Sequence, residues 1–213
     1  MAFGQGLLSQ HRPLHHTRTR RRLSGAVAVL VVFLALSTES ALLGGSWWAL
    51  ATAWAGLMLV MAGIFGRLLA TLFIGGHKGA ELVRAGPYGV TRNPLYLSSL
   101  LATIGLGLAS ANPLLLLLLL LAFLLYYPGV LTREEEKLAR RHGAAYQDYR
   151  RAVPRFWPRP GADWREPDWV TASPRQFRMA LADAGWFIIA YIALRAIAEA
   201  HARGVLPAYT LPF

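Results

Sequence analysis

The side chains whose types and spacing could carry chemistry lie in two polar blocks of the chain. The first block contains Arg92 and Tyr96, and the second opens on Glu134 and Glu135. An arginine can hold a carboxylate in a bidentate pair, and a carboxylate inside a protein needs a cation beside it. These residue types therefore indicate either a charged ligand or an internal ion pair. The two blocks span residues 82–96 and 133–158.

Part of this pattern also has a purely structural explanation. Asn93-Pro94 is a turn dipeptide, and Pro94 suits the first turn of a helix with Asn93 as its N-cap. Thr132 and Glu135 are spaced as a capping box, which would make Thr132 the start of a helix. Under this interpretation the acidic residues only stabilise a helix end.

A helical stripe favours a different role for Glu135. Apolar and aromatic residues recur three and four positions apart through the second block, and Glu135 falls on their inward-facing side. A carboxylate there needs a cationic partner, which an arginine or a cationic ligand would supply. The stripe consists of Leu131, Glu135, Leu138, His142, Tyr146, Tyr149 and Val153.

The elements that position these blocks are predicted to span a membrane. Hydrophobic residues make up 55% of the 213 residues and charged residues 15%, against about 25% charged in ordinary soluble domains. The mean hydropathy is +0.37. Helices of about 20 apolar residues cross a bilayer, so we expect an all-α fold, a polytopic membrane helical bundle of about five transmembrane helices with a cytoplasmic cofactor pocket. The expected spans are 24–43, 47–74, 95–109, 113–131 and 179–200.

The connections between neighbouring spans predict how the blocks meet. The connection at residues 110–112 is so short that it forces the flanking segments into an antiparallel hairpin. This hairpin joins the two polar blocks. It should therefore bring Arg92 and Tyr96 near Glu134 and Glu135.

The charge distribution predicts an orientation. The net charge is +11, with eleven of the 22 Lys and Arg residues in 132–178 and five in the N-terminal arm. By the positive-inside rule the N-terminus and both long loops are cytoplasmic and the C-terminus is outside. The charge then indicates contact with anionic lipid headgroups and no nucleic acid. The expected organisation is a basic cytoplasmic arm at 1–23, a membrane core at 24–158 including a cytoplasmic helix at 132–153, a cytoplasmic linker at 159–178, and a transmembrane helix and tail at 179–213.

Several other chemistries are excluded or disfavoured. The chain has no cysteine, which excludes thiolate metal sites, iron–sulfur clusters and cysteine nucleophiles. His11, His15 and His16 lie in an arginine-rich arm without carboxylates, so we expect no metal site there.

Three charges fall inside the last expected span, at Asp183, Arg195 and Glu199. Asp183 and Arg195 are about 18 Å apart along a helix and cannot pair with each other. An ionisable residue in a membrane span suggests a function. Substrate binding and contacts between helices or subunits both remain open for them.

The ordered set of motifs resembles the signature of the membrane isoprenylcysteine carboxyl methyltransferase and phospholipid methyltransferase superfamily. Each motif alone is weak, but their order around a membrane hairpin is specific, and the resemblance covers about residues 67–158. The motifs are Gly86-Pro87-Tyr88, Arg92-Asn93-Pro94-Leu95-Tyr96, Glu134-Glu135-Glu136-Lys137-Leu138, His142-Gly143, Tyr146-Gln147-Asp148-Tyr149 and Val153-Pro154-Arg155-Phe156-Trp157-Pro158.

The resemblance implies S-adenosylmethionine as methyl donor and co-substrate. Arg92 would pair the donor's carboxylate, while Glu134 and Glu135 would bind its ammonium or ribose diol and offset the sulfonium charge. The implied catalytic residues are Arg92, Tyr96, Glu134 and Glu135. The implied donor-binding residues are Gly86, Tyr88, Arg92, Asn93, Pro94, Tyr96, Glu134, Glu135 and Tyr146.

Departures from the signature concern the acceptor. Asn93 stands where the carboxyl methyltransferases usually have His, which resembles the phospholipid branch, and the last span lies beyond the common core. We therefore expect a membrane lipid or lipophilic small molecule as acceptor, first of all a phospholipid amine. A carboxyl or thiol acceptor is the alternative within the family. A membrane reductase using NADPH and a non-catalytic lipid-binding protein are the alternatives of other classes.

Overall fold

The chain is described by a computed structural model in which residues 14–40, 47–75, 81–159, 164–165 and 167–211 are placed. The start of the N-terminal arm, with His11, and the connection at 41–46 lie outside these residues. The described residues form helices and two three-residue strands. They are α1 (Leu14–Ser37), β1 (Thr38–Ser40), α2 (Trp47–Ile74), α3 (Pro87–Val90), α4 (Pro94–Ala109), α5 (Pro113–Ala152), α6 (Pro174–Ala202) and β2 (Tyr209–Leu211).

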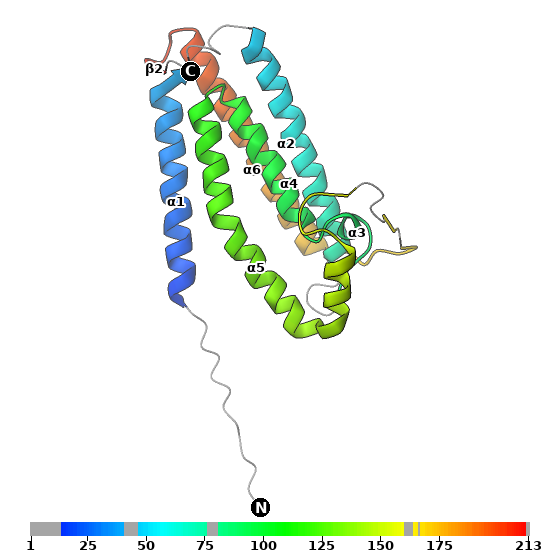
Figure 1. Cartoon of the computed structure of the whole chain (residues 1–213). Coiled ribbons are helices and arrows are strands. Elements are labelled where there is room, and N and C mark those ends of the chain that lie inside the picture. Colours follow the sequence, from blue (N-terminus) through cyan, green and yellow to red (C-terminus); the bar gives the residue numbers. More distant parts are fainter. Residues whose placement is uncertain (1–13, 41–46, 76–80, 160–163, 166, 212–213) are drawn as a thin grey trace, which may run out of the picture.

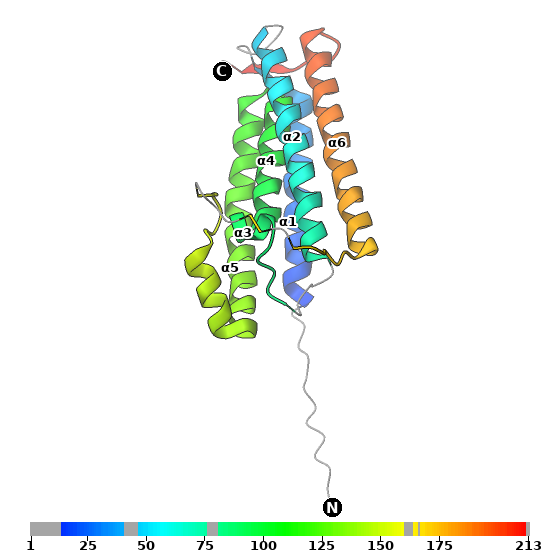
Figure 2. The ribbon, with the colours of Figure 1, turned by 90° about the vertical axis from the view of Figure 1, so that its right-hand side faces the viewer.

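The long helices α1, α2, α4, α5 and α6 form one bundle with alternating directions (Figure 1). Helix α3 and the last turns of α5 lie at one end, which we call the α3 end, and β1 and β2 lie at the far end. Helices α5 and α6 flank the α2–α4 pair on opposite sides (Figure 2). Helices α2, α5 and α6 are long and apolar enough to cross a membrane, and α4 and Gly25–Ser37 of α1 are shorter apolar helices. The expected all-α membrane bundle is confirmed.

Close packing of α2 on α4 positions the α3 end. A Cβ atom on Gly63 would lie 2.6 Å from the carbonyl oxygen of Ser98, and one on Gly56 would lie 2.7 Å from that of Gly105. Only glycine allows backbones to approach so closely, and small residues are the usual contact between membrane helices. The start of α4 is therefore held directly against α2.

The hairpin of α4 and α5 closes as its short connection predicts. The side chain of Asn112 caps α5, accepting hydrogen bonds from the backbone N–H of Leu114 at 3.0 Å and of Leu115 at 3.4 Å. The side-chain nitrogen Nδ2 of Asn112 also donates to Thr38 Oγ1 at 2.9 Å, which links the hairpin to the residue that follows α1. The two helices thus run antiparallel from the far end to the α3 end.

Helix α5 is longer than expected and is interrupted at a different residue. It runs from Pro113 to Ala152, so the expected residues 132–152 belong to a helix, but that helix does not start at Thr132 and the capping-box interpretation is wrong. The interruption lies at Gly143, which has φ 49° and ψ −123°. Beyond this residue the helix folds back towards α3 (Figure 1). A local capping motif inside an otherwise continuous helical sequence does not by itself start a new helix.

The backbone conformation of Gly143 leads to a prediction. Replacement of Gly143 by Ala is expected to destabilise the fold by about 1–3 kcal/mol, because residues with a Cβ atom rarely adopt this conformation. A steric clash would not be the cause, since a Cβ atom at Gly143 meets nothing within 4 Å. Thermal unfolding in detergent measures the change. The matched control is Gly129→Ala in the same helix, which also meets nothing within 4 Å and should leave stability unchanged or raise it. Equal melting temperatures for the two variants would contradict the prediction.

The far end differs from the first expected span. Helix α1 ends at Ser37, and Thr38–Ser40 pair in parallel with Tyr209–Leu211, so the span expected at 24–43 is wrong for residues 38–40. Glu39 accepts a hydrogen bond from Thr210 Oγ1 at 2.9 Å. Glu39, which falls inside the apolar span expected at 24–43, therefore lies in strand β1 and not in a helix.

The charges of α6 make separate contacts. Asp183 lies 3.0 Å from the guanidinium of Arg67 on α2, and Arg195 lies 3.9 Å from Glu199 one turn along α6. Asp183 and Arg195 do not pair with each other, as expected. The sequence left substrate binding and contacts between helices or subunits open for Asp183. The structure shows a contact between helices, from Asp183 of α6 to Arg67 of α2.

Candidate functional site

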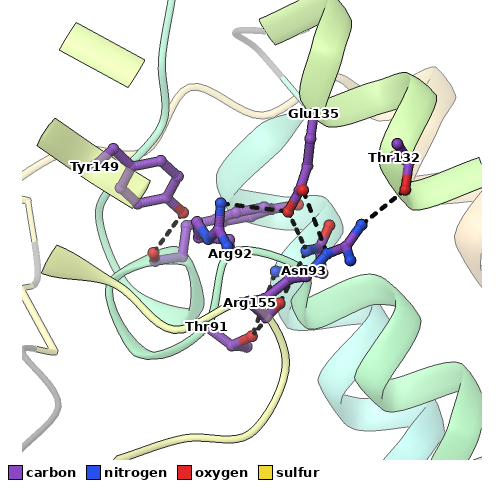
Figure 3. A network of polar contacts seen from close by, with 8 residues as sticks. Thr91, Arg92, Asn93, Thr132, Glu135, Tyr149 and Arg155 are labelled. Carbon is purple, nitrogen blue, oxygen red and sulfur yellow. Dashed lines mark hydrogen bonds and ion pairs between the residues drawn. The ribbon is translucent and has the colours of Figure 1, made fainter. Parts of the chain in front are cut away.

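The two polar blocks meet at the α3 end, around the carboxylate of Glu135 (Figure 3). Arg92 Nη1 lies 3.4 Å from Glu135 Oε1, and Arg155 Nε lies 3.3 Å from Glu135 Oε2. Asn93 Nδ2 donates to Glu135 Oε1 at 3.4 Å. We call Arg92, Asn93, Glu135 and Arg155 the Glu135 cluster.

The Glu135 cluster is enclosed and carries excess positive charge. The side chains of Arg92 and Glu135 are 9% and 16% exposed, while that of Arg155 is 45% exposed. Two guanidinium groups face one carboxylate, so the cluster has a formal charge of about +1 among its ionised members. Such an arrangement favours a further anionic group in contact with the arginines.

The segment that carries Arg92 and Asn93 is held by hydrogen bonds to the end of α5. The backbone N–H of Arg92 donates to the carbonyl oxygen of Pro154 at 2.9 Å. The side chain of Asn93 donates to the carbonyl oxygen of Arg155 at 2.9 Å, and Thr91 Oγ1 donates to the same oxygen at 3.3 Å. The fold-back after Gly143 therefore builds one wall of the site.

Asn93 takes a different role from the one that the turn pattern suggests. It occupies the position before α4, but its side chain makes no capping hydrogen bond there. The amide points to Glu135 and to the backbone of Arg155. Asn93 is therefore the N-cap residue of α4, as expected, but the expectation that its side chain caps the helix is wrong, because that side chain belongs to the cluster.

Buried tyrosines line the same region. Tyr149 OH donates to the carbonyl oxygen of Tyr88 at 2.7 Å. Burial raises the pKa of the Tyr88, Tyr146 and Tyr149 phenols above the ordinary value, with nearby negative charge adding to the effect at Tyr88 and Tyr146. These phenols therefore stay protonated, which allows Tyr149 to donate its hydrogen bond to Tyr88.

The Tyr149 hydrogen bond gives a prediction with a pH dependence. Tyr149→Phe is expected to cost about 1 kcal/mol at pH 8, because the buried carbonyl of Tyr88 loses its donor. The folded-state pKa of Tyr149 is raised, whereas an unfolded tyrosine titrates near pH 10. Wild-type stability should therefore fall as pH rises above about 10, and Tyr149→Phe should show less of this fall.

Melting temperatures at pH 8 and pH 10.5 measure both effects. The control is Tyr209→Phe, because Tyr209 is 81% exposed in β2 and its phenol is not part of the buried cluster. An alkaline fall of the same size in wild type and Tyr149→Phe would contradict the assignment.

Several buried polar atoms around the cluster have no hydrogen-bond partner among the described residues. They include Nε and Nη1 of Arg92 and the hydroxyl groups of Tyr88 and Tyr146. Arg92 Nη1 lies within ion-pair distance of Glu135 but does not meet hydrogen-bond geometry. Buried polar atoms usually have a partner, so a group of unpaired ones indicates a polar ligand.

A second acidic contact lies beside the cluster on a more open face. Tyr96 OH donates to Glu134 Oε2 at 2.7 Å, and Glu134 is exposed. The ring of Tyr96 packs edge-on against Tyr127 of α5, with centroids 5.4 Å apart. The hairpin thus brings Arg92 and Tyr96 to Glu135 and Glu134, as the sequence predicts.

The remaining expected residues are placed as follows. Pro94 is buried at the first position of α4, and Tyr146 is 1% exposed. Gly86 has φ 56°, its N–H donates to the carbonyl oxygen of Arg165 at 2.8 Å, and a Cβ atom on it would meet the ring of Phe73. Packing against Phe73 is therefore sufficient to explain this glycine.

Arg155 and Thr91 belong to the site but were not identified from the sequence. Arg155 lies inside the closing Val-Pro-Arg-Phe motif, and the motif pattern predicts no role for its side chain. Its contact with Glu135 spans 20 residues of chain and depends on the fold-back at Gly143. The closing motif therefore indicates the segment 153–158 as part of the site but does not single out the side chain of Arg155.

Among the described residues, no group of three or more His, Cys, Asp or Glu side chains is arranged to hold a metal ion. The Glu135 cluster pairs its carboxylate with arginines and an amide. The site therefore offers contacts to charged organic groups.

Comparison with known proteins identifies relatives over nearly the whole chain. The chain is 34% identical over 200 residues to the nickel-cobalt-cadmium resistance protein NccN of Alcaligenes xylosoxydans xylosoxydans, covering 93% of each chain. It is 32% identical over 204 residues to the cobalt-zinc-cadmium resistance protein CzcN of Cupriavidus metallidurans, covering 92% of this chain and 91% of the relative. No solved structure matches the chain significantly.

The phospholipid methyltransferase family matches residues 39–145. These residues include α2, α3, α4 and most of α5, and hence Arg92, Asn93 and Glu135. The match confirms the resemblance that the ordered motifs indicated. The chain belongs to the phospholipid methyltransferase family.

Proposed function

We propose that the protein transfers a methyl group from S-adenosylmethionine to a lipid or lipophilic acceptor in the membrane. The observation that carries the proposal is the Glu135 cluster, in which Arg92 forms an ion pair with a carboxylate while its buried Nε and Nη1 make no hydrogen bond to the described residues. The donor carries a carboxylate, an ammonium and a ribose diol, so its polar groups match both signs of charge at this site. When bound, it supplies a methyl group on a positively charged sulfur.

Each charged residue has a proposed task. Arg92 pairs the donor's carboxylate, for which its fork of N–H groups is suited. Glu135 binds the ammonium or the diol, and Arg155 holds Glu135 in place from the opposite side. Glu134, held by Tyr96, offsets the sulfonium charge nearer to the open face. The protein's main contributions to a methyl transfer are alignment and a site from which water is excluded.

The acceptor is proposed to be a phospholipid amine. Asn93 resembles the phospholipid branch of the superfamily, and α6 adds an apolar helix beyond the family match. A carboxyl or thiol acceptor is the alternative within the family. The two relatives are named for resistance to metal ions. Under this proposal, any such role of the present chain would act through a modified membrane molecule.

Calorimetric titration of the purified protein with S-adenosylmethionine and with NADPH tests the donor. Binding of S-adenosylmethionine alone is expected. Binding of NADPH alone would favour a membrane reductase, and binding of neither would favour a non-catalytic lipid-binding protein. Membranes containing the protein and methyl-labelled donor should then yield label in the lipid extract. Label in the protein fraction only would contradict a lipid acceptor.

The site is proposed to face the cytoplasm, because most cations lie in the segments at the α3 end. Cysteine labelling is clean here, since the chain has no native cysteine. Ala152→Cys, at the end of α5, should react only with reagent on the cytoplasmic side. Ala208→Cys, near β2, should react only from the outside. The reverse pattern would overturn the orientation.

A further inference from the structure

An ion pair within the bundle lies apart from the Glu135 cluster. Arg67 of α2 contacts Asp183 of α6 through Nη2 at 3.0 Å. Its other terminal nitrogen, Nη1, donates to Ser99 Oγ of α4 at 2.6 Å. The guanidinium also lies 5.8 Å from the centre of the Phe187 ring of α6. Three helices thus converge on one cation.

This ion pair is only partly satisfied. Within the part of the chain that the structure describes, the buried Nε atom of Arg67 has no hydrogen-bond partner, and Asp183 contacts the guanidinium through a single oxygen. The side chain of Asp183 is 56% exposed, whereas that of Arg67 is 23% exposed. Charges in membrane helices are costly, and those that persist usually mark a functional site. A pair joined through a single carboxylate oxygen leaves hydrogen-bonding capacity unused on both side chains.

The position of Arg67 relates it to the proposed site. Its partner Ser99 lies three residues after Tyr96 on α4, so the two side chains share one face about one helical turn apart. Tyr96 holds Glu134 and packs against Tyr127. The guanidinium of Arg67 therefore lies about one turn deeper along α4 than the open acidic contact at Glu134.

We propose that Arg67 binds the oxyanion of the lipid acceptor, a phosphodiester or a carboxylate, and that Asp183 is the internal anion that the lipid displaces. The proposal rests on the proposed methyl transfer to a membrane lipid. The family match supplies Arg67 and Ser99, whereas Asp183 comes from α6, which lies beyond it. The Asp183 side chain is 56% exposed and contacts Arg67 through one oxygen, so protein packing leaves it room to turn away from the guanidinium.

The proposal requires opposite effects from the two halves of the ion pair. Arg67→Gln removes the anchor and should weaken oxyanion binding about tenfold or more. Asp183→Asn removes the competing anion and should strengthen binding by up to about fivefold. A purely structural ion pair predicts a different result. Both variants would then lower thermal stability alike, and neither would change the affinity for an anion.

Three probes with the same twelve-carbon chain distinguish the anion. Dissociation constants are measured in dodecyl maltoside micelles for three probes. The probes are dodecylphosphocholine, dodecanoate and, as the uncharged reference, labelled dodecyl maltoside. Preference for dodecylphosphocholine identifies a phosphodiester, and preference for dodecanoate identifies a carboxylate. Equal affinity for all three probes in wild type would overturn the proposal.

The matched control is Arg195→Gln on α6. Arg195 is 24% exposed, close to the value for Arg67, but its carboxylate partner Glu199 lies on its own helix. It should leave the affinity for both anionic probes unchanged. An equal loss in Arg195→Gln and Arg67→Gln would show general attraction to cations and would overturn the site.

Donor titration separates this proposal from the proposed function. All four proteins, wild type included, should bind S-adenosylmethionine alike, because Arg67, Asp183 and Arg195 lie outside the Glu135 cluster. Failure of wild type to bind the donor would overturn the methyl-transfer function. Normal donor binding together with unchanged anion affinity in Arg67→Gln would overturn only the role of Arg67.

Discussion

Glu135→Gln is expected to weaken S-adenosylmethionine binding about tenfold or more, whereas Glu136→Gln should bind the donor as wild type does. Glu135 is 16% exposed and contacts Arg92 and Arg155. Glu136 is 57% exposed, and its ion-pair contact is with Arg140, at 3.9 Å one turn along the helix. Loss of a charge-assisted contact in a partly buried site costs about 1.5–3 kcal/mol, which corresponds to at least about tenfold in affinity.

Calorimetric titration of both variants in one detergent measures the difference. Glutamine keeps the shape of the side chain but leaves Arg92 and Arg155 without their shared anion, so stability must be checked as well. Melting temperatures, together with a partial recovery of donor binding in Glu135→Asp, separate a binding role from a folding role. If Glu135→Gln and Glu136→Gln bind the donor alike, Glu135 serves only to join α5 to the segment before α4.

Arg92→Ala is expected to lose most of the donor affinity, and Arg92→Lys should retain part of it. Lysine keeps the positive charge but lacks the planar fork that matches a carboxylate. The rival interpretation is that Arg92 reaches lipid headgroups at the start of α4. Its side chain is 9% exposed and contacts Glu135, which favours the donor site over the headgroups.

Dissociation constants of the two Arg92 variants, measured under identical conditions, decide between these interpretations. Arg140→Ala is the control, because Arg140 is 75% exposed on α5 and is also a basic residue near the site. It should bind the donor normally. Wild-type affinity in both Arg92 variants would remove Arg92 from the donor site and leave it a structural role beside Glu135.

The sequence by itself determined the class of fold and the approximate place of the site. Long apolar segments exclude a soluble domain because each must be covered by lipid or by another helix. The three-residue connection between α4 and α5 leaves no path except an antiparallel return. The stripe from Leu131 to Val153 also placed Glu135 on the inner face, because burial follows the helical period. The family followed from the order of short motifs around this hairpin.

The tertiary structure decided which side chains meet. The capping pattern at Thr132 is a local signal, and the continuous helix overrides it, while the true interruption at Gly143 depends on the fold-back onto α3. Asn93 was a plausible helix cap until Glu135 and the backbone of Arg155 were placed beside it.

The longest-range contacts show the same limit. Arg155 reaches Glu135 only because α5 reverses direction, and Arg67 reaches Asp183 across 116 residues of chain. Hydropathy and motif spacing report on neighbours along one helix, since the period of a helix relates residues three and four apart. A contact between helices depends on how each is rotated about its axis, and for α2 and α4 the close approach at their glycines restricts that rotation.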